Sequence, residues 1–179
     1  MALLPRRPRR APRPPADVVR AAAVQPIAAA PVVGGGWLVL GAREWVVVAE
    51  EGDDGDGAAP AGWSAVERRP WHEVDSASWD ADTSSVHVRW IDGTTRRVAL
   101  ADDHPGLPQV VRERVEASIA HQVVRDLPGG VQVRAVIRRD GEGALTSQVS
   151  VVGTDVASPE VLRAADEAEA QARAAVGLD

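Results

Sequence analysis

The feature that most constrains the fold of this chain is a change of hydrophobic period at Leu107. Before this residue, apolar side chains form short β-branched or aromatic runs separated by turn residues, which is the pattern of antiparallel strands. After it, apolar side chains recur at four-residue steps, which is the pattern of an amphipathic helix. The sequence therefore predicts an α+β protein in which a strand-rich body precedes a helix.

The runs before Leu107 predict about seven strands, at residues 32–33, 37–40, 45–48, 63–66, 71–74, 85–90 and 95–100. Asp92-Gly93 between the last two runs is a strong hairpin signal. The acidic, Gly-rich segment 50–62 cannot continue a strand and predicts a solvated hairpin loop. A calcium loop is the alternative, but carboxylates do not fall at the alternate positions that it needs and no Glu closes it.

The predicted helix extends from Leu107 to the Pro-Gly-Gly segment at 128–130. Its apolar stripe consists of Leu107, Val111, Val115, Ile119 and Val123. Residues 131–137 and 145–152 then predict a hairpin, and a second helix begins after Ser158, with Pro159 at its first position. The C-terminal part is therefore predicted to be a ββα unit.

A strand-rich body with a Trp-containing last hairpin and a closing helix resembles the element order of PH-like and GRAM-like domains. Residues 70–74, 78–83 and 86–90 also resemble a group of small actinobacterial proteins of unknown function. The resemblance covers about residues 22–126 and implies a bent antiparallel sheet closed by a helix. It divides the chain into a tail at 1–20, a PH-like domain at 21–126 and a ββα appendage at 127–179. Gly34-Gly35-Gly36 stands where phosphoinositide-binding PH domains carry basic residues, so no phosphoinositide binding is expected.

The composition argues against several enzyme classes. The chain has no Cys, Lys, Tyr or Phe, which excludes thiolate nucleophiles, Schiff-base lysines, a P-loop lysine and a tyrosine acid or base. The four His lie apart from one another and lack the spacing of a helical zinc site; they are His72, His87, His104 and His121. We expect no catalytic residues, no metal and no cofactor.

The segment 71–79 contains the candidate partner-binding residues. In a strictly alternating strand, Trp71, Glu73, Asp75 and Trp79 share one face. Two indoles beside two carboxylates can hold a cationic peptide through cation–π attraction and charge. The alternative is that a bulge near Asp75 resets the register and turns both Trp into the core.

The N-terminal arm is the second candidate site. Arg6, Arg7, Arg9, Arg10 and Arg13 alternate with Pro, which predicts a disordered tail. The net charge is −6, and residues 1–20 hold six Arg and one Asp, so the rest of the chain carries −11. An acidic body repels phosphate groups, so contact with nucleic acid or an anionic membrane must use the arm alone.

The leading functional prediction is a non-enzymatic protein-interaction or scaffolding module with an unknown protein partner. The alternative is a binder of nucleic acid or anionic membrane through the arm, and an unrecognised enzyme is third. No apolar segment long enough for a signal peptide or a membrane span occurs, so a cytoplasmic protein is expected.

Overall fold

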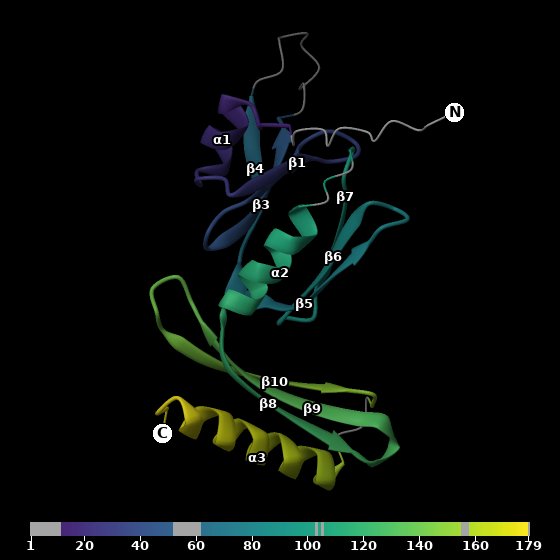
Figure 1. Cartoon of the computed structure of the whole chain (residues 1–179), viewed down its shortest axis with the longest axis vertical. Helices are drawn as coiled ribbons and strands as arrows, with labels where there is room; N and C mark the ends of the chain where they lie inside the picture. The colour runs from purple at the N-terminus through teal and green to yellow at the C-terminus, as the bar shows by residue number, and fades with distance from the viewer. Residues whose placement is uncertain (1–11, 52–61, 103, 105, 155–157, 179) are drawn as a thin grey trace, which may run out of the picture. The chain divides into compact units, whose positions relative to one another are not determined.

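A computed structural model describes residues 12–51, 62–102, 104, 106–154 and 158–178 (Figure 1). The described residues form three α-helices and three antiparallel sheets of four, three and three strands. The predicted α+β class is therefore confirmed. No helix in the described part of the chain is long and apolar enough to cross a membrane.

The first sheet has the strand order β1-β2-β3-β4. Its strands are β1 (Ala28–Pro31), β2 (Trp37–Leu40), β3 (Glu44–Glu50) and β4 (Trp63–Pro70). Helix α1 (Ala16–Ala22) buries Val18 and Ala22 in a cluster with Val39, Val46 and Val48 of the sheet. Small and β-branched side chains form this core because they pack closely between a helix and a pleated sheet.

The second sheet has the order β5-β6-β7 and follows the short 3-10 helix η1 (Trp71–Glu73). Its strands are β5 (Val74–Asp80), β6 (Ser85–Trp90) and β7 (Thr95–Ala99). The predicted Asp92-Gly93 turn joins the last two strands: Asp92 Oδ1 accepts from the Thr94 amide at 2.9 Å, and Gly93 has a φ of 82°. A positive φ favours glycine, so this dipeptide specifies the hairpin.

The third sheet has the order β10-β9-β8 and is covered by helix α3 (Pro159–Ala175). Its strands are β8 (Ile119–Leu127), β9 (Val131–Arg139) and β10 (Leu145–Val152). As predicted, Ser158 is the N-cap, and its Oγ accepts from the Val161 amide at 3.3 Å. The core between sheet and helix contains Val123, Val133, Ala135, Ile137, Val161, Ala168 and Ala172.

Residue contacts divide the chain into two compact units. Unit 1 is residues 1–69, 78–87 and 97–110, and it contains α1 and the first sheet. Unit 2 is residues 70–77, 88–96 and 111–179, and it contains η1, the third sheet and α3. The strands of the second sheet contribute residues to both units.

The prediction of a helix through Val123 is wrong beyond Ala117. Helix α2 is Leu107–Ala117, and Ile119 and Val123 belong to strand β8. The helix ends where Ser118 Oγ donates to Val115 O at 2.6 Å, and β8 then pairs with β9. The C-terminal part is consequently βββα in place of the predicted ββα. Seven strands precede residue 101 in the described chain, but they are divided between two sheets.

The predicted disordered tail is also too long. Residues 16–20 lie in α1, and Val18 is fully buried in unit 1. Val18 and Ala22 are spaced by one helical turn and so face the sheet together. Residues 1–11 lie outside the described residues.

The packing of α3 predicts different responses to the same enlargement on its two faces. Ala168 is fully buried against the sheet, whereas Ala170 in the same helix is exposed. We expect Ala168→Leu to lower the free energy of unfolding by about 1–3 kcal/mol, because the extra methylenes do not fit a close-packed core. Ala170→Leu, with the same change of helix propensity, should alter it by under about 0.5 kcal/mol. Urea denaturation measures both, and equal effects would show that α3 faces the sheet differently.

Candidate functional site

The four residues of the predicted Trp and acid face do not lie in one alternating strand. Trp71 and Glu73 lie in η1, whereas Asp75 and Trp79 lie in β5. The 3-10 turn interrupts the two-residue alternation on which the prediction depended. Trp71 is 3% exposed, and Trp79 is half-buried. The alternative reading of this segment, a reset register, agrees with the buried position of Trp71.

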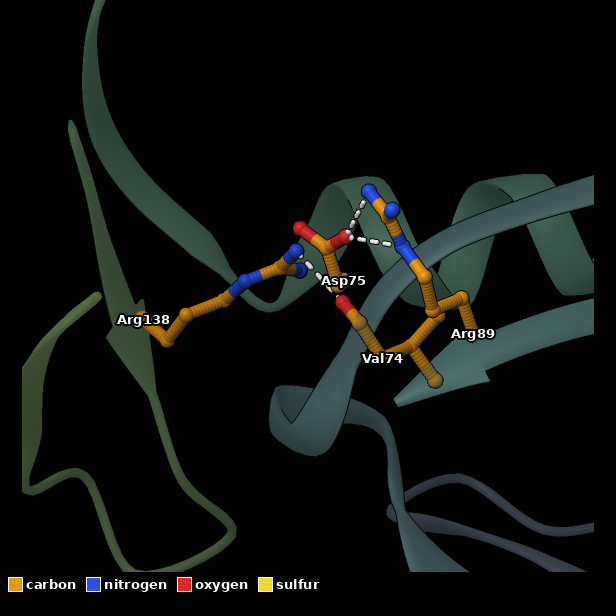
Figure 2. Close-up of polar contacts among 4 residues, drawn as sticks. All are labelled: Val74, Asp75, Arg89 and Arg138. Atoms are coloured by element: carbon orange, nitrogen blue, oxygen red, sulfur yellow. Dashed lines mark hydrogen bonds and ion pairs between the residues drawn. The ribbon is translucent and has the colours of Figure 1, made fainter. Parts of the chain in front are cut away.

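Asp75 is paired with an arginine of its own chain (Figure 2). Its Oδ2 accepts from Arg89 Nε at 2.8 Å and lies 2.5 Å from Arg89 Nη2. Both arginine nitrogens therefore contact one carboxylate oxygen, in a charge-assisted pair. The Asp75 side chain is only 17% exposed, so its charge is largely used within unit 2.

Arg138 of β9 brings a second guanidinium close to the same carboxylate (Figure 2). Arg138 is 1% exposed, although arginine has the longest side chain of the charged amino acids. Its Nη1 donates to Ser118 Oγ at 2.7 Å and to Val115 O at 3.3 Å. Its Nη2 donates to Val74 O at 2.5 Å. The guanidinium therefore connects β9, the end of α2 and the start of β5.

The charge state of Arg138 follows from this environment. Burial, with a smaller contribution from the nearby Arg134, lowers the pKa of Arg138 to about 10, and the Asp75 carboxylate opposes the shift. The side chain therefore keeps its charge at neutral pH. A buried charge is tolerated only when it is hydrogen-bonded, and here the acceptors come from two segments, the end of α2 and the start of β5. We assign the Asp75, Arg89 and Arg138 cluster to the stability of unit 2.

Of the five arginines of the predicted N-terminal site, the structure describes only Arg13. Arg6, Arg7, Arg9 and Arg10 lie outside the described residues. Arg13 is exposed and precedes α1. No described contact joins Arg13 to another of these arginines.

A cleft in unit 1 places an indole beside carboxylates. It has a volume of about 530 Å³ and is called the Trp63 cleft below. It is lined by Asp17, Arg20 and Ala21 of α1, by Glu50 and Glu51 at the end of β3, and by Gly62 and Trp63 at the start of β4. The Glu51 amide donates to Gly62 O at 3.0 Å, which holds the ends of the two strands together. Trp63 is half-buried and packs on the core under α1.

The Trp63 cleft carries net negative charge. Among the described residues of its lining Arg20 is the only cation, and its Nη1 lies 3.0 Å from Asp17 Oδ1. Because Arg20 pairs with Asp17, no other cation of the described lining faces the carboxylates of Glu50 and Glu51. An aromatic face beside carboxylates is suited to a cation, and above all to a planar guanidinium.

Sequence reasoning missed this combination. The sequence predicts a solvated loop at 50–62 and a strand that begins at Trp63. Neither prediction concerns which side chains of the two segments lie together. The cleft also needs α1, which comes from residues predicted to be a tail. A Trp that directly follows an acidic segment is the one signal that was available in the sequence.

No protein-family model, curated protein or solved structure matches this chain. Across residues 12–51, 62–102, 104, 106–154 and 158–178, no group of three or more His, Asp or Glu side chains is arranged to hold a metal ion.

Replacement of the buried arginine provides a direct test of its structural role. We expect Arg138→Ala to lower the free energy of unfolding by about 3 kcal/mol, because it removes a cation whose acceptors stay buried. Arg139→Ala, at the exposed neighbouring position, should cost under about 0.5 kcal/mol. Thermal and urea unfolding measure both. Similar stabilities of the two variants would contradict the structural role of Arg138.

Proposed function

We propose that this protein is a non-enzymatic protein-interaction module that binds an arginine-containing segment of a partner protein in the Trp63 cleft. The observation that supports this proposal is the position of Trp63 beside Glu50 and Glu51, in a cleft where Arg20, the one cation among the described lining residues, is already paired with Asp17. The cleft thus has the composition that sequence reasoning sought at residues 71–79.

The chemistry of the cleft favours arginine over other ligands. A guanidinium can stack on the Trp63 ring while its N–H groups donate to carboxylates, and such an aromatic contact contributes about 0.5–2 kcal/mol. Exposed carboxylates add attraction that salt screens. One bound arginine therefore gives weak affinity, and useful affinity needs several contacts along a basic segment.

The proposal includes two further expectations, one about the fold and one about the cellular location. The order of seven strands followed by α2 supports a PH-like or GRAM-like arrangement, a fold that serves as a peptide-binding module in many proteins. The proposal places the protein in the cytoplasm, where a basic segment of another protein is accessible to it. Binding of nucleic acid or anionic membrane through Arg6 to Arg13 remains the competing outcome of the experiments below.

A peptide-binding measurement tests the proposal. The probe is a fluorescein-labelled peptide of alternating Arg and Gly, and the readout is fluorescence anisotropy. We expect binding that weakens with added salt and weakens about ten-fold in a variant with Glu50→Gln and Glu51→Gln, because two carboxylates are lost. Trp63→Leu, which keeps an apolar side chain on the core, should weaken binding roughly three-fold or more.

The matched control removes the same charge elsewhere. Asp166→Asn with Glu167→Gln neutralises two exposed acids of α3 and should leave peptide affinity unchanged. Equal weakening by this control would show binding to the general negative charge of the protein, and the cleft proposal would be wrong. The same holds if a labelled oligonucleotide binds more tightly than the peptide.

A further inference from the structure

The outer edge of β10 differs from the other sheet edges of the described residues. β4, β5, β7 and β8 each carry charged side chains, such as Arg68, Asp75, Arg97 and Arg125. β1 is short, ends at Pro31, and has its Pro31 carbonyl bound by the Ala101 amide at 2.9 Å. β10 is eight residues long and contains neither a charge nor a proline. Proteins normally protect their edge strands with charge, proline or shortness, and β10 has none of these protections.

The register identifies the backbone groups that this edge presents. The Asp140 amide donates to Ala144 O at 3.0 Å where the β9–β10 hairpin closes. Hydrogen-bonded pairs alternate along an antiparallel ladder, so Arg138 and Thr146 form the next such pair, and Val136 and Gln148 the one after. Even-numbered residues of β10 therefore bond to β9. The amides and carbonyls of Leu145, Ser147, Val149 and Val151 point outward from the sheet.

The side chains along this edge are suited to burial. Val149 and Val151 are each 38% exposed, and Val152 is 51% exposed. Valine is a strongly favoured strand residue, and cross-strand pairs of β-branched side chains stabilise a sheet. The described residues place no other strand beside this edge.

We propose that β10 pairs with β10 of a second copy of this chain, antiparallel about a two-fold axis, so that two three-stranded sheets become continuous. Around such an axis each outward amide of one copy meets an outward carbonyl of the other. This inference goes beyond the proposed peptide site, because it uses unit 2 and none of the residues of the Trp63 cleft.

Charge favours a second copy over a foreign strand. A two-fold axis places identical side chains near one another, so any charge on β10 would face a like charge. Two copies of a chain with net charge −6 also repel each other. This repulsion is smallest where the contacting strands carry no charge, as in β10. Recognition of a different protein would instead be favoured by complementary charges on the strand. β10 has the composition that self-pairing requires.

Sedimentation velocity of the full chain over an about hundred-fold range of concentration tests this inference. The wild type should pass from monomer to dimer as concentration rises. Val149→Lys should raise the dissociation constant roughly ten-fold or more, because each copy then brings a positive charge into the paired edge. Val124→Lys is the matched control, since Val124 is a similarly exposed valine of β8, and it should leave dimerisation unchanged.

Two further measurements guard against misfolding of the lysine variant. Val149→Pro removes only an outward amide, which β9 does not use, and should also abolish the dimer while circular dichroism stays native. Hydrogen exchange of wild-type Ser147, Val149 and Val151 amides should slow as concentration rises. A wild type that stays monomeric throughout, or a dimer lost equally in Val124→Lys and Val149→Lys, would overturn the proposal.

Discussion

The guanidinium of Arg138 places a positive charge in a region of unit 2 that excludes water, and this charge is stable only where acceptors surround it. Its acceptors are Ser118 Oγ, Val115 O and Val74 O, which come from the end of α2 and the start of β5. All of these segments must be in place before the charge is satisfied, so Arg138 makes their folding cooperative. The Asp75 carboxylate belongs to the same arrangement, because it pairs with Arg89 and lies near the Arg138 charge.

The sequence predicted the α+β class, the strand-rich body and the capped helix α3, because each depends on local signals such as turns, alternation and Ser158-Pro159. It failed at Ile119 and Val123 for a definite reason. Residues four apart lie on one face of a helix, but they also lie on one face of a strand, whose side chains repeat every second residue. A four-residue step therefore does not distinguish the two. The choice of strand is made by pairing of β8 with β9, a tertiary contact that the local pattern does not contain.

The Trp63 cleft was harder to predict than the fold, because it is assembled from three segments that are distant in sequence. Asp17 and Arg20 reach it only because Val18 is buried and fixes α1 against the sheet. Glu50 and Trp63 are brought together by pairing of strands across segment 50–62. The sequence-based candidate at residues 71–79 assumed unbroken alternation, which the 3-10 turn at Trp71–Glu73 interrupts.

The central claim is that an indole of unit 1 recognises arginine, and the chain offers a residue-specific probe of it. The protein contains six Trp and therefore six indole N–H signals in a nitrogen-proton NMR spectrum. Titration with the Arg and Gly peptide should shift the Trp63 signal, assigned from Trp63→Leu, and leave those of the buried Trp45 and Trp71 in place. A spectrum in which the Trp79 signal moves while that of Trp63 does not would contradict the account.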